Sequence, residues 1–163
     1  MKQDIKKFEA TEDMFVQQFG GERITDSRQW TIDADCLLRG KTVSIKDQSK
    51  SSAKTGNITV ETKTVNPKTK EEKLGFLYYN KTDYYAWLVS YKDQEIWLVC
   101  PSSFFKSFVE NNYHYQFKTN PDTVEKNIRQ GWKFAEGHGL LLKIEKLINS
   151  PEVKKIKLKK IGE

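Results

Sequence analysis

The chain has 163 residues, and its 28 Lys and Arg against 22 Asp and Glu give a formal net charge of +6. This length predicts one domain over residues 1–163, with a basic segment over residues 151–163. The 9 Phe, 7 Tyr and 4 Trp are enough to fill a core, which excludes a wholly disordered chain. No apolar run approaches the ~20 residues of a membrane span, and no apolar segment follows the charged start. We therefore expect a cytoplasmic protein without membrane contact.

The two cysteines, Cys36 and Cys100, lie inside apolar runs. Neither has a second Cys or a His at the spacing of a zinc site. In a reducing compartment, buried free thiols are the expectation. The positive net charge is compatible with a polyanionic partner, and also with solubility alone.

The first half of the chain predicts a helix, a β-hairpin and a strand. Apolar spacing predicts the helix over residues 8–19, which Gly20-Gly21 ends. After a polar bend over 26–29, two alternating runs, 30–38 and 42–48, predict the hairpin, with its turn at Gly40-Lys41. The Lys- and Ser-rich residues 49–56 predict a mobile loop, the next strand covers 57–62, and residues 66–73 are polar and turn-like.

The second half predicts a mixture of short helices and strands. Asp83 predicts the cap of a helix over residues 84–87, and the run 95–99 predicts a strand. Helices are expected at 104–109, after Pro101, and again after Pro121. Residues 140–144 predict a strand, and the lysine-rich residues 153–161 an amphipathic strand or helix docked on the body. This order of elements predicts a single-domain α/β sandwich around a mixed central sheet.

The predicted hairpin has one apolar and one polar face. Its turn would pair Asp35 with Lys46 and Asp33 with Gln48, and would place Ser44 on the same polar face. Carboxylates hold a hard divalent cation such as Mg²⁺, and a nearby lysine can orient a water molecule and offset phosphate charge. These are the groups that metal-dependent phosphodiester hydrolysis needs. The same alternation is also typical of a half-exposed hairpin without any site, where cross-strand Asp–Lys pairs are common.

Five short motifs, taken in their order, resemble the PD-(D/E)XK nuclease superfamily, and in particular its small phage members. They are the Gln-containing lead and Asp of residues 28–33, the strand of 43–50, the Thr-Gly-Asn strand of 55–61 with its Glu, the Lys-x-Asp-Tyr run of 81–84 and the Gly-x-Gly run of 137–139. The resemblance spans about residues 8–148. It implies a restriction-endonuclease-like fold and a metal-dependent DNA endonuclease with Mg²⁺ or Mn²⁺ as cofactor. It also implies DNA as partner and the pairing of two copies into a homodimer.

The chain departs from the acid-x-Lys motif of this superfamily, because Ser44 stands two residues before Lys46. The metal site is therefore either rearranged or lost. In the second case the protein is an inactive nuclease fold that binds DNA or inhibits another protein. A third interpretation is an interaction protein with no nucleic-acid role.

The resemblance assigns roles to residues of the hairpin and its surroundings. The catalytic candidates are Asp33, Lys46, Asp47 and Gln48. Alternation points Asp47 toward the core unless a bulge turns it outward. The candidate metal ligands are Asp33, Asp35, Asp47, Glu61 and Glu12. The candidate contacts to nucleic acid are Lys50, Lys54, Ser49, Arg28 and Gln29.

Overall fold

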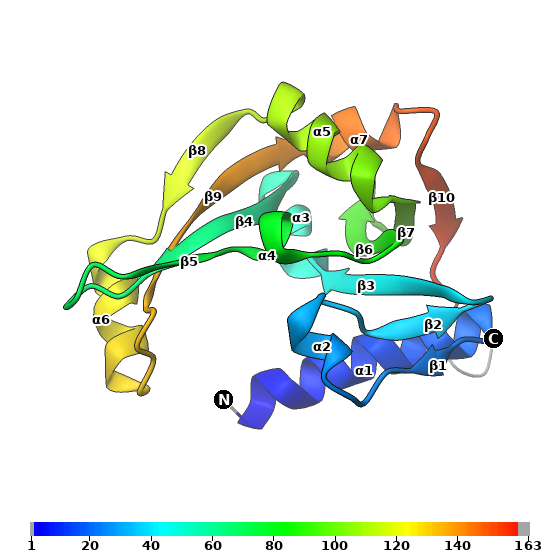
Figure 1. Cartoon of the computed structure of the whole chain (residues 1–163). Coiled ribbons are helices and arrows are strands. Elements are labelled where there is room, and N and C mark those ends of the chain that lie inside the picture. Colours follow the sequence, from blue (N-terminus) through cyan, green and yellow to red (C-terminus); the bar gives the residue numbers. More distant parts are fainter. Residues whose placement is uncertain (1, 160–163) are drawn as a thin grey trace.

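Two β-sheets of different kinds form the framework of this chain (Figure 1). The structure is a computed structural model that describes residues 2–159, with side chains from residue 10 onward. The larger sheet has the order β1-β2-β3-β6-β7-β10 and the smaller one β5-β4-β9-β8. The strands of the larger sheet are β1 (Glu22–Arg23), β2 (Cys36–Leu38), β3 (Lys41–Asp47), β6 (Tyr84–Tyr91), β7 (Gln94–Pro101) and β10 (Lys154–Lys157). The strands of the smaller sheet are β4 (Asn57–Val65), β5 (Glu72–Leu74), β8 (Tyr115–Lys118) and β9 (Glu136–Lys143).

The larger sheet is mixed, as predicted. Strands β3 and β6 run parallel, whereas the other neighbours in both sheets run antiparallel. Parallel neighbours need a crossover connection, and here this connection contains β4, β5 and two short helices. The site described below lies along this crossover.

Helices cover both faces of the larger sheet. Helix α1 packs beneath β2 and β3, and α4, α5 and α7 lie on the opposite side, between or beside the two sheets (Figure 1). In the described part of the chain, no helix is long and apolar enough to cross a membrane. The helices are α1 (Lys2–Phe19), α2 (Arg28–Thr31), α3 (Ser49–Thr55), α4 (Phe76–Tyr79), α5 (Ser102–Asn112), α6 (Pro121–Arg129) and α7 (Ile144–Ile148).

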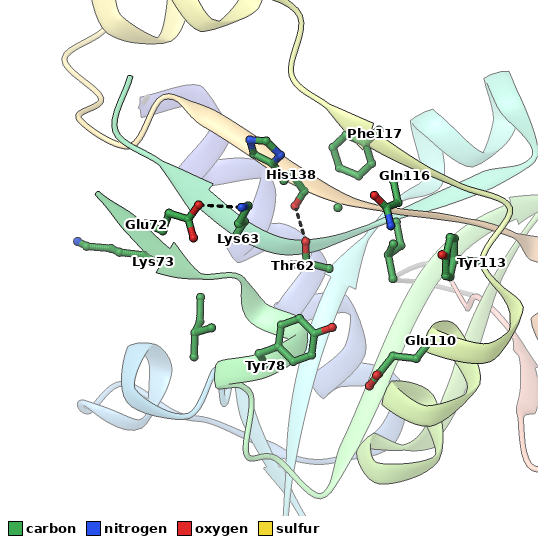
Figure 2. Close-up of a pocket in the computed structure, with 13 residues that line it drawn as sticks. Thr62, Lys63, Glu72, Lys73, Tyr78, Glu110, Tyr113, Gln116, Phe117 and His138 are labelled. Atoms are coloured by element: carbon green, nitrogen blue, oxygen red, sulfur yellow. Dashed lines mark hydrogen bonds and ion pairs between the residues drawn. The ribbon is translucent and has the colours of Figure 1, made fainter. Parts of the chain in front are cut away.

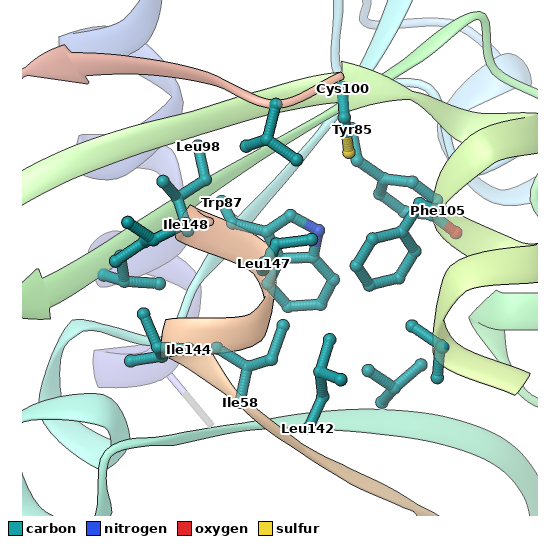
Figure 3. Close-up of a cluster of buried hydrophobic side chains, with 14 of the residues drawn as sticks. Ile58, Tyr85, Trp87, Leu98, Cys100, Phe105, Leu142, Ile144, Leu147 and Ile148 are labelled. Atoms are coloured by element: carbon teal, nitrogen blue, oxygen red, sulfur yellow. The ribbon is translucent and has the colours of Figure 1, made fainter. Parts of the chain in front are cut away.

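Strand β6 is at the centre of the core. Its side chains alternate between two apolar clusters, with Trp87 facing the smaller sheet and Leu88 facing α1. Figure 3 shows Trp87 surrounded by side chains from both sheets and from α5 and α7. Burial of each such side chain stabilises the fold by roughly 1.5–3 kcal/mol. The prediction of a helix over residues 84–87 was wrong, because a strand with neighbours on both edges and both faces has no polar face to reveal its period.

The hairpin is shorter than predicted, and its turn lies one residue earlier. Arg39 and Gly40 form the turn with φ 52° and 79°, so Leu38 pairs with Lys41 and Cys36 with Val43. Positive φ at both turn positions matches the right-handed twist of a two-residue hairpin. The turn at Gly40-Lys41 and the pairings of Asp35 with Lys46 and of Asp33 with Gln48 were therefore wrong.

Residues 28–31 and 49–55 are helical, so the strand start at residue 30 and the mobile loop over 49–56 were also wrong. Asp83 caps no helix. Its carboxylate accepts hydrogen bonds from Thr42 N (2.9 Å) and Thr42 Oγ1 (3.1 Å), where β3 and β6 begin side by side.

Several other predictions are confirmed. The described chain contains the helix over 8–19, the strands over 57–62 and 95–99, and the helices after Pro101 and Pro121. Cys36 and Cys100 are buried free thiols, and burial raises the pKa of each to about 12. The basic segment forms β10 on the edge of the larger sheet, and its last residues, 160–163, lie outside the described residues.

Candidate active site

Asp33 has an unusual backbone conformation. It lies between α2 and β2 with φ 63° and is 6% exposed. A non-glycine residue in the left-handed region costs roughly 1–2 kcal/mol, and such residues persist where the surrounding contacts hold them. Here Ala34 N donates to Arg28 O (3.0 Å) and Asp35 N donates to Val43 O (2.9 Å), so the backbone is fixed on both sides of Asp33.

Three side chains donate to the Asp33 carboxylate. Lys46 Nζ lies 2.9 Å from Oδ1 and 2.7 Å from Oδ2. Ser44 Oγ (2.9 Å) and Asn80 Nδ2 (3.1 Å) both donate to Oδ2. Ser44 and Lys46 are two residues apart on β3 and therefore share one face of the strand. The structure thus brings Asp33, Ser44 and Lys46 together, although not through the predicted hairpin pairing.

Asn80 was missed by the sequence analysis. Its Oδ1 accepts hydrogen bonds from Thr82 N (3.0 Å) and Thr82 Oγ1 (2.9 Å), which turns its amide nitrogen toward Asp33. The Asn-x-Thr spacing is typical of a local turn stabilised by the Asn side chain. That signal predicts the turn but gives no information about a partner 47 residues away.

Lys46 is held from a second direction. Its ammonium lies 4.4 Å from the centre of the Phe76 ring on α4, a cation–π contact that adds to the ion pair with Asp33. The next residues of α4 reach the same region. Burial, followed by the charges of Asp33 and Glu61, raises the pKa of Tyr79.

Glu61 reaches this site from the smaller sheet. Burial raises the pKa of its carboxyl, the Lys46 charge lowers it, and the Asp33 charge raises it. Among residues 10–159, no side chain forms a hydrogen bond or an ion pair with this carboxyl. A β-bulge lies between Glu61 and Lys63, and a Cβ at Gly75 would lie 2.5 Å from the Glu61 carbonyl oxygen. The bulge and the close glycine fix the backbone from which this carboxyl projects.

Two other predicted ligands, Asp35 and Glu12, contact each other toward α1, and the charges of Lys46 and Asp33 also act on Asp35. The Asp35 carboxylate accepts a hydrogen bond from Ile45 N (2.6 Å) and also contacts the Glu12 carboxyl. Glu12 forms an ion pair with Arg23. Burial, followed by the Asp35 charge, nevertheless raises the pKa of Glu12 to about 7, and burial also raises that of Asp35.

The side chains of Asp47 and Gln48 form hydrogen bonds with neighbouring elements of the fold. Asp47 follows strict alternation and faces α1, where its carboxylate accepts from Thr11 Oγ1 (2.7 Å) and from Ser49 N (3.0 Å) at the start of α3. The Gln48 amide oxygen accepts from Ser51 Oγ (2.7 Å) and Thr59 N (3.3 Å). Neither side chain has a contact with Asp33 among those found in the described chain.

Some of the side chains predicted to contact nucleic acid are exposed, whereas others already have hydrogen-bond or ion-pair partners within the protein. Lys50 and Lys54 are exposed on α3, whereas the Ser49 hydroxyl donates to Asp47 (2.7 Å). Arg28 is paired with Asp26 (2.7 Å), and the Gln29 amide donates to the Ile24 carbonyl.

Asp33 and Glu61 are the candidate ligands of a divalent cation, because the charge of Asp33 acts on the Glu61 carboxyl. Within residues 2–159, no three His, Cys, Asp or Glu residues converge as a ready-made metal cluster. Mg²⁺, however, is commonly held by one or two carboxylates together with water and substrate phosphates. Asp33 and Glu61 would supply two carboxylates. A bound cation would also stabilise the charged form of Glu61, whose carboxyl is half-buried and has lost part of its hydration.

Comparison with models of known protein families finds no match for this chain, and no curated protein matches it either. The arrangement of the site itself therefore has to carry a functional assignment.

Proposed function

We propose that the protein is a metal-dependent DNA endonuclease with a restriction-endonuclease-like fold. Asp33 and Glu61 would hold Mg²⁺ or Mn²⁺, and Lys46 would act beside them. The observation that carries this proposal is the Asp33 carboxylate, buried in a left-handed backbone and bound by Lys46, with the unpartnered Glu61 carboxyl nearby. Conformational strain and a desolvated carboxyl beside a charged pair are features that cluster at functional sites.

The residues of the site have distinct roles in this proposal. Water attacks the phosphorus and forms one P–O bond while the bond to the leaving oxygen breaks. A metal ion held by Asp33 and Glu61 would supply Lewis acidity and lower the pKa of the attacking water. Lys46 orients the water or neutralises the charge that develops on the phosphate. Ser44 and Asn80 keep the Asp33 carboxylate in one orientation.

The surroundings agree with a nucleic-acid substrate. Lys50 and Lys54 are exposed on α3, which follows directly after the Lys46 strand. Lysines placed there can contact the phosphates that flank the scissile bond. Pairing of two copies, needed to cut both strands at once, stays a prediction, as does the cytoplasmic location.

One observation favours the second candidate, an inactive nuclease fold that binds DNA or inhibits a protein. Both oxygens of Asp33 already have donors, and Ser44 occupies the position of the expected acid. A cation would have to share the Asp33 carboxylate with these donors. The two candidates predict opposite results in a cleavage assay.

The test is cleavage of supercoiled plasmid DNA in Mg²⁺ or Mn²⁺ by the wild type and by D33N, E61Q and K46A. We expect each variant to cut at least about a hundredfold more slowly. E125Q, which changes an exposed glutamate of α6, is the control and should cut like the wild type. D33N suits the left-handed backbone, since Asn tolerates this region, and its thermal unfolding reports whether the fold survives.

Two results would contradict the proposal. A wild type that cuts nothing in either metal, but still binds DNA, would establish the inactive fold. Full activity of E61Q would show that Glu61 is not a metal ligand, and Asp33 would then be the one carboxylate left in the proposed site.

A further inference from the structure

A groove of about 730 Å³ lies on the inner face of the smaller sheet, opposite α4 and α5 (Figure 2). It forms where the sheet extends beyond the core, so that its inner face is no longer covered by the larger sheet (Figure 1). Its wall residues come from β4, β5, β8, β9, α4 and the end of α5. This volume is in the range of sites for small organic ligands.

Three aromatic side chains line the groove without ring partners. In the core, aromatic rings contact one another, as Tyr85 and Phe105 do at 4.8 Å. Within the described part of the chain, Tyr78, Tyr113 and Phe117 contact no other aromatic ring, and the two tyrosines are 38% and 39% exposed. The Lys106 ammonium lies 5.2 Å from the centre of the Tyr78 ring, so a base would stack on the other face of that ring. Exposed ring faces in a concave site are typical stacking surfaces for nucleobases, because every base offers a π-face.

The Phe117 ring lies over a glycine. A Cβ at Gly139 would come within 2.5 Å of that ring, so the missing side chain allows the Phe117 ring to approach β9 closely. Both residues line the groove.

The charged groups of the groove suit the other parts of a nucleotide. Lys63 is held by Glu72 (2.8 Å), and the Lys73 ammonium lies over the Phe134 ring (4.1 Å). Ammonium groups in fixed positions can contact a phosphate. At the other end, the charge of Glu110 acts on Tyr78, and Figure 2 shows Glu110, Tyr78 and Tyr113 around one part of the groove. A carboxylate accepts hydrogen bonds from the exocyclic amine of a base such as cytosine.

We propose that this groove binds an unpaired nucleotide, with its base stacked on the tyrosines, its exocyclic amine on Glu110 and its phosphate near Lys63. The nucleotide can be free in solution or belong to an unpaired part of a DNA strand. The proposal goes beyond the endonuclease activity and does not depend on it, since it concerns binding without metal.

The groove and the candidate active site share two elements of structure. On β4, Thr62 lines the groove, and its neighbour Glu61 belongs to the site. On α4, Tyr78 lines the groove, and the next residue, Tyr79, feels the charges of Asp33 and Glu61. A nucleotide in the groove would thus contact residues adjacent to two groups of the site.

The test is a binding titration without divalent metal, followed by fluorescence anisotropy. The probes are fluorescein-labelled single strands of about ten cytidines or ten thymidines, a duplex of the same length, and unlabelled dCMP as competitor. We expect the single strands to bind more tightly than the duplex, and Y78A or Y113A to weaken their binding at least about fivefold. Y78F keeps the ring and should bind like the wild type, as should Y115A, which removes an exposed tyrosine of β8 that does not line the groove.

The remaining arms decide the source and the orientation of the nucleotide. Competition by dCMP would identify free nucleotides as ligands, whereas binding of the strand alone would identify unpaired DNA. E110Q should reduce the preference for cytidine over thymidine. Equal binding of single strand and duplex, or unchanged binding by both Y78A and Y113A with normal thermal unfolding, would overturn the proposal. If the protein binds single strands in this assay but never cleaves DNA, the proposal of a nucleotide-binding groove stands and the proposal of an endonuclease is refuted.

Discussion

At the scale of single residues, Ser44 is the residue whose interpretation the structure changes most. In the sequence it looks like a lost acid beside Lys46. In the structure its hydroxyl donates to Asp33, whereas a carboxylate there would place two negative charges against one lysine. Glu61 brings the second carboxyl from another strand. The site can therefore keep two carboxylates and a lysine without an acid at position 44.

Glu12 gives a prediction about stability and pH. Its pKa is about 7 in the folded protein, against an ordinary value of 4.5. The folded protein thus keeps a proton that the unfolded chain releases between these values. The stabilising contribution is fully present below about pH 4.5 and is lost as the pH rises through about 7. We expect the unfolding temperature of the wild type, relative to E12Q, to fall between about pH 5 and pH 8.

The measurement is thermal unfolding of both proteins across this pH range, with E125Q as the control. Subtraction of the variant curve removes the contribution of distant titrating groups, whereas that of Asp35, which contacts Glu12, changes together with it. A constant difference between wild type and E12Q over the whole range would contradict the shifted pKa of Glu12.

At the scale of elements, α3 joins the two sheets near the site. Its Ser52 hydroxyl accepts a hydrogen bond from Ser90 N of β6 (2.8 Å), and Gln48, just before the helix, contacts β4. All residues of this short helix except Ala53 are polar, and isolated helices of such length are unstable in water. Tertiary contacts on both sides therefore determine its conformation.

Gly56 ends α3 in the left-handed conformation, with φ 71°, and no atom lies within 4 Å of where its Cβ would be. Gly56→Ala therefore meets only a conformational penalty, which we expect to lower the free energy of unfolding by about 1 kcal/mol. Gly56→Asn should cost less, since Asn tolerates this region. Urea denaturation measures both, and equal costs for Ala and Asn would show that backbone conformation is not the cause.

At the scale of the whole molecule, the basic residues are spread over separate surfaces. Lys50 and Lys54 lie on α3 beside the site, whereas Lys154 and Lys155 lie on β10 at the edge of the larger sheet. A net charge of +6 alone gives general attraction to DNA. Specific phosphate contacts would come from one of these surfaces and not from the other.

The salt dependence of DNA binding distinguishes the two surfaces. If α3 contacts phosphates, K50A and K54A should each reduce the slope of log affinity against log salt by about 1. The matched variants K154A and K155A should leave this slope nearly unchanged. Binding titrations between about 50 and 200 mM salt provide the slopes, and a larger effect of the β10 variants would place the DNA on the other edge.

The sequence predicted correctly where local pattern and tertiary environment agree. The helix over 8–19 has an apolar stripe that packs on one face of a sheet, and residues 57–62 alternate because only one of their faces is buried. Prediction failed at β6, where burial on every side removes the alternation, and at α3, which contacts β6 and β4. Asp33 and Lys46 were predicted to lie on the same polar face of the hairpin, but the strand pairing behind that prediction does not exist.

The sequence by itself determined the mixed α/β class and the buried thiols, because these depend on composition and on local periodicity. Only the tertiary structure decided which acidic residues belong together. It gave Asp35, Glu12 and Asp47 hydrogen-bond or ion-pair partners other than Asp33, although the charge of Asp33 still acts on Asp35. It brought Asn80 into contact with Asp33, and Glu61 within reach of the Asp33 charge, from distant parts of the chain. Periodicity indicates which face of a strand a side chain occupies, but not which strand from elsewhere in the chain packs against that face.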